Sequence, residues 1–98
     1  MEEAHIMSIL SAIGQPTRLA ILKCVAPYSR GDDAYGLPAG EIAYQLGIPP
    51  PTLSFHLKDM TYKGLLIQER YGRSIYYRAD LDALVKTLDY LVTEVCGA

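Results

Sequence analysis

Basic side chains concentrate in one part of the 98-residue sequence, where they could bind a phosphate backbone. Residues 55–79 carry five lysine or arginine side chains and two carboxylates, a net charge of +3. Because the whole chain carries −2, the remaining residues carry −5. A basic surface on an acidic body favours nucleic acid at one face and repels it elsewhere, although the same charges could simply solvate a surface. The five basic residues are Lys58, Lys63, Arg70, Arg73 and Arg78.

The groups that could ligate a metal or act as nucleophiles are few and widely spaced. Cys24 and Cys96 are the only cysteines, and His5 and His56 are the only histidines. They form no C-x-x-C pattern and no other zinc-ligand spacing, and two cysteines are too few for a disulfide framework. The sequence also contains no recognisable nucleophile–base pair and no phosphate-cradling loop, which argues against an enzyme.

Length and composition predict a single folded domain over residues 1–98. The chain is 50% hydrophobic and 20% charged, which is typical of a globular protein and argues against disorder. No apolar run approaches the roughly 20 residues of a membrane span. The acidic start, MEEAHIMSIL, lacks the basic region of a secretory signal. We therefore expect a cytoplasmic protein without membrane contact, in which both cysteines are reduced.

Apolar spacing predicts two helices in the first third of the chain. In residues 2–13, isoleucines and a leucine recur at i, i+3, i+4 and i+7, which is one helix face. Pro16 suits the first turn of a second helix, which runs to about residue 26 and is apolar around much of its circumference. Residues 28–36 (YSRGDDAYG) are polar and glycine-rich and predict a loop.

Two further helices and a tight turn predict a helix-turn-helix. Residues 40–46 form a short helix that Gly47 ends, and residues 51–62 form the next, ended by Lys63 and Gly64. Since a residue that precedes proline avoids the α region, we expect residues 48–50 to be extended and Pro51 to open the second of these helices. The proline run should stiffen the turn.

A hairpin and a last helix complete the predicted order of elements. Strands at 65–70 and 74–78 flank a turn that contains Gly72 and has Arg73 at its tip. A long apolar stripe then predicts a helix over residues 81–96. The expected fold is mostly α with a β-hairpin wing, a winged helix-turn-helix with five helices.

Helical geometry separates the two faces of residues 51–62. Leu53, Leu57 and Met60 share one face and should be buried, whereas Phe55, the only phenylalanine, points to the opposite side. An exposed Phe is unusual enough to require a partner, which could be DNA or a neighbouring loop. In a helix-turn-helix, the N-terminal half of the second helix enters the major groove.

Each predicted DNA-facing side chain has a chemical role. Phe55 can contact a thymine methyl group, Ser54 can bond a base edge or a phosphate, and Lys58 can neutralise a phosphate. The amide of Thr52 can also reach a phosphate. His56 lies beside the core face, where it is more often a packed or bridging histidine, although it could touch phosphate. In the hairpin, arginines and tyrosines suit contact with the backbone or minor groove. The predicted DNA-binding residues are Thr52, Ser54, Phe55, His56, Lys58, Arg70, Arg73, Tyr76 and Arg78.

The first and last helices carry strong apolar stripes. Ordinary core packing could explain them, but a small chain gains burial by association, and we favour a homodimer interface. The predicted interface residues are Ile6, Ile9, Leu10, Ile13, Leu84, Leu88, Leu91 and Val95.

Several segments in order along nearly the whole chain resemble the ArsR/SmtB family of bacterial winged-helix repressors. The resemblance implies a homodimer joined through its first and last helices. It also implies binding to a pseudo-palindromic, double-stranded operator, and release when a metal ion, metalloid or thiol-reactive signal is sensed. The segments are 16–22 (PTRLAIL), 40–43 (GEIA), 52–58 (TLSFHLK), 64–66 (GLL) and 72–77 (GRSIYY).

The sensor motifs of that family match only in part. Residues 37–41 contain none of the metal-binding cysteines that several members have there, and the last helix contains no histidine. Its tail resembles arsenite-sensing members but retains only Cys96, so that As(III) or another thiophilic ligand there would need thiolates from a partner chain. Cys24 and Cys96 are also similar to the cysteine pair of members that sense persulfide or oxidants. Cys24 is displaced by about one residue from the matching position, however, and could instead be a small core residue.

Two alternatives therefore stay open at the level of sequence. The protein could be a repressor that has lost inducer sensing. It could also be a winged-helix module that binds protein through Phe55 and the proline turn.

Overall fold

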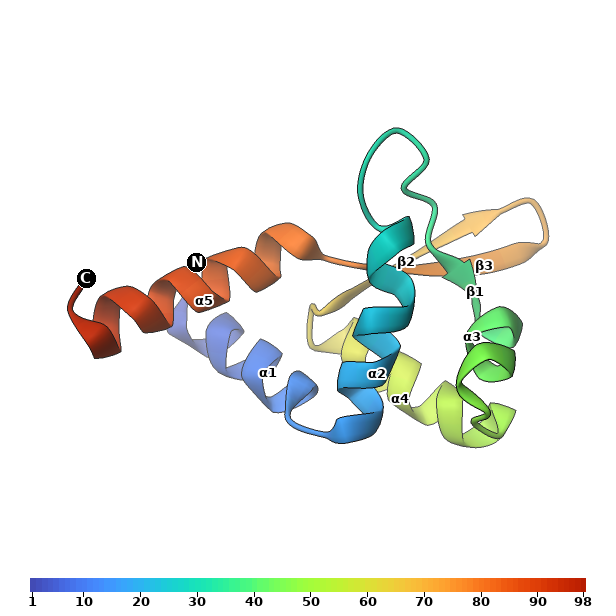
Figure 1. Ribbon diagram of the computed structural model, residues 1–98, viewed down its shortest axis with the longest axis horizontal. Coiled ribbons are helices and arrows are strands. Elements are labelled where there is room, and N and C mark those ends of the chain that lie inside the picture. Colours follow the sequence, from blue (N-terminus) through green and yellow to red (C-terminus); the bar gives the residue numbers. More distant parts are fainter.

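The computed structural model describes residues 1–98 and contains five helices and a small sheet (Figure 1). Prediction and structure agree on the winged helix-turn-helix order, with helix boundaries that differ by at most one residue. Figure 1 shows α1 and α5 side by side at one end of the molecule, whereas α3 and the hairpin lie at the other. The elements are α1 (Glu3–Ile13), α2 (Pro16–Val25), a 3₁₀ turn η1 (Ala26–Tyr28), β1 (Leu37–Pro38), α3 (Ala39–Leu46), α4 (Pro50–Tyr62), β2 (Leu66–Tyr71), β3 (Ser74–Ala79) and α5 (Leu81–Cys96).

The sheet has a third strand that the sequence pattern did not predict. Its order is β1-β3-β2, antiparallel throughout, with Leu37 opposite Tyr77 and Leu66 opposite Ala79. Because β1 has two residues, it is too short to show an alternating pattern. Gly72 adopts a φ of 64° and begins the two-residue turn of the β2–β3 hairpin, a conformation that glycine reaches without strain.

The proline run begins α4 one residue earlier than predicted. Pro49 is extended, with φ −56° and ψ 136°, and its carbonyl accepts the first helical hydrogen bond from the Leu53 amide at 3.0 Å. Pro50 is therefore already helical, although it precedes Pro51. Only the first residues of α4 lack amides that could donate, and these need no partner inside the helix. Gly47, with a φ of 65°, ends α3 and turns the chain toward α4.

The core lies between α1, α2, α3, α4 and the sheet. Two residues that were predicted for a dimer interface belong to it: Ile6 and Ile9 of α1 are 1% and 0% exposed in the single chain. Their assignment to a surface shared with a second chain is therefore wrong, because α1 turns them toward its own domain. The largest fully buried side chains are those of Ile6, Ile9, Ile21, Val25, Ile42, Leu53, Leu57, Met60, Leu65 and Thr87.

No single helix is long and apolar enough to cross a membrane, and the apolar pair formed by α1 with the segment Pro16–Tyr28 is bent by 99°.

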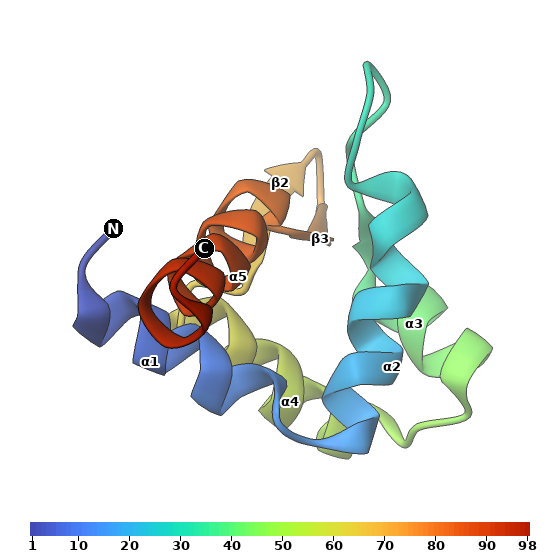
Figure 2. The same ribbon diagram turned by 60° about the vertical axis from the view of Figure 1, so that its left-hand side comes forward.

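The loop between η1 and β1 stands out from the body of the protein (Figures 1 and 2) and is fastened to the sheet at both ends. At its start, the Ser29 hydroxyl accepts a hydrogen bond from the Ala79 amide at 2.9 Å. At its end, Gly36 has a φ of 79°, and a Cβ atom there would lie 2.1 Å from the carbonyl oxygen of Tyr77. This close approach lets β1 pair with β3 and supports the hairpin.

We predict that Gly36→Ala destabilises the fold much more than Gly31→Ala. Both glycines are left-handed, but a Cβ at Gly31 would meet nothing within 4 Å. The left-handed conformation alone should cost about 1–2 kcal/mol at either position. The backbone clash at Gly36 should add roughly 1–3 kcal/mol. Urea unfolding followed by circular dichroism measures both free energies, and equal losses for the two variants would contradict the proposed close packing.

Candidate nucleic-acid interface

Helix α4 buries one face and leaves the other open. Leu53, Leu57 and Met60 are at most 1% exposed, and Phe55 on the opposite side is 67% exposed. The predicted orientation of Phe55 is thus confirmed, and no loop of the chain covers it. Its aromatic neighbour is His56, whose ring lies edge-on with centroids 5.8 Å apart. Contact of Phe55 with a base stays a prediction.

The open side of α4 faces the wing across a groove. Ser54 and Lys58 line this groove on the helix side, and both are exposed, as is Thr52 at the start of the helix. The groove measures about 490 Å³ and continues onto Gln68 and Tyr77 of the sheet. Sequence reasoning did not assign Gln68 to the site, although its spacing of two residues from Leu66 and from Arg70 puts all three on one face of β2.

Strand register divides the predicted wing residues between two faces. Tyr77 pairs with Gln68, and Ile75 pairs with Arg70, so these side chains lie on the face that turns toward α4. Tyr76 and Arg78 alternate with them and lie on the opposite face. Arg70 therefore lies on a different face of the hairpin from Tyr76 and Arg78, and contact of these residues with DNA stays a prediction.

The opposite face of the hairpin has its own internal contacts. Arg78 forms an ion pair with Glu69, which offsets its charge. Tyr76 packs edge-on against Tyr71 at 5.4 Å, and Tyr71 packs in the same way against Tyr35 of the preceding loop at 5.0 Å. The tyrosines thus pack the wing against the loop, and the Arg78 charge is paired within the hairpin.

Only part of the basic segment is therefore available to phosphate. Lys63 forms an ion pair with Asp59 at 3.1 Å, as Arg78 does with Glu69. Lys58, Arg70 and Arg73 form no ion pair, and all three are exposed on α4, β2 and the hairpin turn. These three free cations, one on α4 and two on the hairpin, form the electropositive part of the proposed surface.

His56 acts as a bridge inside the chain. Its Nδ1 accepts a hydrogen bond from the Nε–H of Arg18 at 3.0 Å, and its side chain is half-buried. Burial lowers the pKa of His56, and the Arg18 charge lowers it further, whereas Asp59 opposes the shift. The neutral imidazole, which can accept the bond, is therefore favoured. The bridging interpretation of His56 is confirmed, and a phosphate contact stays a prediction.

The two thiols occupy unlike places. Cys24 is half-buried on α2, where its Sγ–H donates to Oε1 of Gln45 at 3.3 Å. Burial raises the pKa of the Cys24 thiol, and Glu41 raises it further. Cys96 is exposed at the end of α5, which lies apart from α2 in both views (Figures 1 and 2). The chain brings together no group of three His, Cys, Asp or Glu side chains that could hold a metal ion.

An apolar stripe runs along the outer face of α5. Val85, Leu88, Val92 and Val95 are 56%, 52%, 48% and 76% exposed, and their spacing of three and four residues puts them on one side. Of the residues predicted for the interface, Leu88 and Val95 belong to this stripe, and Leu10, Ile13, Leu84 and Leu91 are half-buried. An exposed stripe of this length is typical of an interaction surface.

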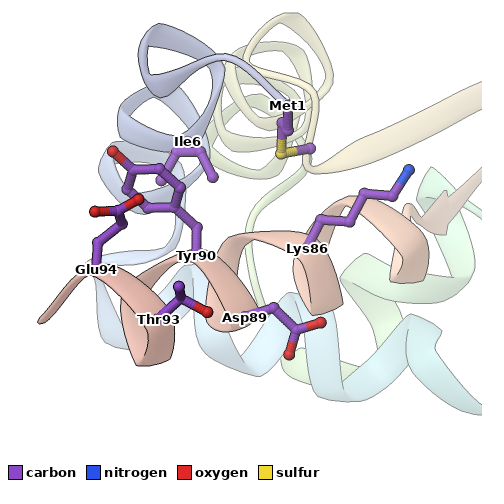
Figure 3. Close-up of a pocket in the computed structure, with 7 residues that line it drawn as sticks. All are labelled: Met1, Ile6, Lys86, Asp89, Tyr90, Thr93 and Glu94. Atoms are coloured by element: carbon purple, nitrogen blue, oxygen red, sulfur yellow. The ribbon is translucent and has the colours of Figure 1, made fainter. Parts of the chain in front are cut away.

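A shallow groove lies beside this stripe, where α5 meets the start of α1 (Figure 3). It measures about 370 Å³, with Ile6 and Tyr90 among its lining residues. The Tyr90 hydroxyl donates to Oε2 of Glu3 at 2.9 Å and so ties α5 to α1. The remaining lining residues are Met1, Lys86, Asp89, Thr93 and Glu94.

Sequence comparisons agree with these features. A family model described as a helix-turn-helix domain matches residues 13–69. The Bacillus subtilis protein YdfF, an uncharacterised HTH-type transcriptional regulator, is 40% identical over 80 residues, 81% of this chain and 33% of that protein. The chain thus spans a third of that relative's length. The nodulation protein NolR of Rhizobium meliloti is 31% identical over 92% of this chain and 69% of its own. The transcriptional repressor SdpR of Bacillus subtilis is 28% identical over 87% of each chain.

Solved structures show the same fold. An ArsR-like transcriptional regulator from Rhodococcus sp. RHA1 has a TM-score of 0.73 and 30% identity, covering 90% of this chain and 76% of that one. NolR from Sinorhizobium fredii has a TM-score of 0.68 and 29% identity, covering 95% and 87%. The homodimeric winged helix-turn-helix DNA-binding domain of Mb0332 from Mycobacterium bovis has a TM-score of 0.66 and 26% identity, covering 92% and 82%.

Proposed function

Because the chain belongs to the ArsR family of DNA-binding, winged helix-turn-helix transcriptional regulators, we propose that it is a homodimeric repressor with a pseudo-palindromic operator. The observation that carries the proposal is the open face of α4. Phe55 is two-thirds exposed there, although it is the only phenylalanine in the chain. The unpaired Lys58 in the groove, with unpaired Arg70 and Arg73 elsewhere on the hairpin, supports the same proposal.

In the proposed complex, α4 enters the major groove with Phe55 toward a thymine methyl group and Ser54 toward a base edge or phosphate. Lys58 neutralises a phosphate, and Arg70 and Arg73 hold the backbone or minor groove beside the wing. The acidic remainder of the chain repels DNA, so that one face alone is used.

The apolar stripe of α5 supports the homodimer. Leu88 lies near its middle and Val95 at its end, and covering such a stripe removes apolar surface from water. Mb0332, a structural neighbour, is homodimeric, which agrees with this assignment. Two recognition helices related by a two-fold axis would read half-sites about one helical turn of DNA apart.

Repression, rather than activation, agrees with the name of the relative SdpR, a transcriptional repressor. As the signal, we propose a thiol-reactive compound or As(III) at Cys96, which is exposed at the end of the helix that the dimer would share. Cys96 thiols from two chains would each replace a hydroxide of arsenite and release water, or one Cys96 thiolate would reduce peroxide to water and become a sulfenic acid. Cys24 is the weaker candidate because its raised pKa reduces the thiolate fraction.

We predict that Lys58→Ala and Arg73→Ala weaken binding to a duplex selected by the protein from a randomised pool. Each should lower the affinity by roughly three- to tenfold and reduce the slope of log affinity against log salt by about one, because a phosphate contact is lost. Fluorescence anisotropy at several salt concentrations measures both quantities. The matched control is Lys23→Ala, an exposed lysine on α2 without an ion pair, which should leave the affinity unchanged.

If the parent protein binds selected and scrambled duplexes alike, and only at very low salt, it is not an operator-binding repressor. Phe55 would then serve a protein partner instead.

The homodimer predicts that Leu88→Asp dissociates the protein. A charge placed in an apolar interface loses water without gaining a partner, and the dimer dissociation constant should rise by roughly 100-fold or more. Light scattering after size-exclusion chromatography measures the mass. Leu19→Asp, at a leucine on α2 that is 49% exposed, is the control and should stay dimeric. A dimeric Leu88→Asp protein would show that α5 is not the interface.

Sensing through Cys96 predicts that Cys96→Ser binds the selected duplex as tightly as the parent but is no longer released by arsenite, persulfide or peroxide. Cys24→Ser should respond as the parent does. Binding titrations in the presence of each compound, with the protein mass measured afterwards, provide the comparison. Equal responses of the parent and Cys96→Ser would contradict the assignment, and a parent that never responds would indicate a repressor without this sensor.

A further inference from the structure

Arg18 of α2 is a buried cation that makes none of the proposed DNA contacts. Its residue is 2% exposed, yet it lies among apolar core residues such as Ile21 and Leu22 on the same helix. A buried charge destabilises a protein unless it is paired and hydrogen-bonded. The partners of Arg18 therefore indicate what it holds in place.

Those partners come from two other helices. The Nη1 of Arg18 donates to Oδ2 of Asp59 at 2.5 Å, and its Nε donates to Nδ1 of His56 at 3.0 Å, both on α4. A longer bond of 3.5 Å joins Nη1 to the carbonyl oxygen of Ala12 on α1. One guanidinium thus links α4 to the end of α1, in the fixed fork geometry that arginine provides.

Lys63 makes a second link of the same kind. Its Nζ donates to the Ser11 hydroxyl of α1 at 3.0 Å and lies 3.1 Å from Oδ2 of Asp59. Asp59 is therefore shared by two cations, and the hydrogen bonds from Arg18 and then Lys63 hold its pKa below the ordinary value. Residues 56, 59 and 63 follow one another at spacings of three and four, so they form a single stripe along α4.

This stripe lies between the buried and the open face of the recognition helix. Apolar packing through Leu53 and Leu57 determines which face of α4 is buried, but it is not directional. Hydrogen bonds to a planar guanidinium are directional, and they constrain how far the helix turns about its axis. His56 directly follows Phe55, and their rings are in edge-on contact. A displacement of the His56 ring would therefore also displace Phe55, the proposed DNA-reading side chain.

We propose that Arg18 is a positioning residue for DNA recognition, which fixes the rotation of α4 relative to α1. A second chain bound at α1 and α5 would then align both recognition helices with the two half-sites. The inference rests on the proposed operator binding. Its consequence is that Arg18 contributes to specificity and touches no DNA.

The test compares specific with non-specific affinity. For Arg18→Met, the ratio of affinities for the selected and a scrambled duplex should fall roughly tenfold or more, the size expected when a hydrogen bond to a charged group is lost. Affinity for the scrambled duplex should change less than about twofold, because it depends on phosphate contacts by exposed cations. Circular dichroism and light scattering confirm that the variant is folded and dimeric. An unchanged ratio in such a protein would overturn the proposal.

A milder pair of variants keeps the test informative if Arg18→Met does not fold. His56→Gln retains an oxygen that accepts from Arg18 and should keep the ratio, whereas His56→Leu has no acceptor and should lower it. If both variants lose affinity for the scrambled duplex as well, His56 contacts phosphate and the positioning role is wrong.

The pH dependence of the specific DNA affinity has one sign if His56 accepts from Arg18 and positions α4, and the opposite sign if His56 contacts phosphate directly. The charged groups that face His56 are Arg18 on α2 and Asp59 on its own helix. Since the pKa is lowered, the bond to Arg18 is intact in neutral solution and is lost as the pH falls below the ordinary value for histidine. The specific affinity of the parent should then decrease on acidification, and that of His56→Gln should not. A direct phosphate contact predicts tighter binding at low pH.

A parent protein that never prefers the selected duplex would refute operator binding itself. If the parent prefers the selected duplex and the Arg18→Met protein keeps the same preference, only the positioning role of Arg18 is refuted.

Discussion

The burial of α4 through Leu53, Leu57 and Met60 is the constraint on which the whole DNA-facing surface depends. A helix can turn only one face to a core, and these three side chains are almost completely buried. Phe55 is consequently left on the open side, beside Ser54 and Lys58, where it has no apolar cover within the chain. The proline run begins the helix at Pro50. Because proline restricts the backbone, the run limits the motion of the first two turns, which carry the exposed residues.

The rest of the fold serves to place and support this helix. The hairpin faces it across a groove, and β1 with the anchored loop supports the hairpin through Gly36 and Ser29. Two of the five basic residues in the segment are neutralised by ion pairs, whereas three remain free: Lys58 in the groove, and Arg70 and Arg73 on the hairpin. The three unpaired cations are thus the ones available to a phosphate backbone.

Prediction from sequence succeeded where the signal was local. Apolar periodicity gave the helices and the hairpin, and helical geometry alone placed Phe55 outside. It failed where the outcome depends on a distant partner. The stripe of α1 could serve a core or an interface, and Ile6 and Ile9 turned out to serve the core. The wing pattern could not tell which strand face α4 would cover, so it did not separate Arg70 from Tyr76 and Arg78, which lie on opposite faces. The bonds of Arg18 join residues 38 and 41 positions apart, which no local pattern reveals.

The central claim is that the open face of α4 and the adjacent wing form one DNA surface. A titration of the ¹⁵N-labelled protein with its selected duplex, followed by NMR, tests it residue by residue. The account predicts that amide resonances of residues 52–58 and of the turn at Gly72 and Arg73 shift together with one binding constant, while the outer loop around Tyr35 stays unchanged. Shifts centred on the Tyr35–Tyr71–Tyr76 cluster, with α4 unaffected, would contradict it.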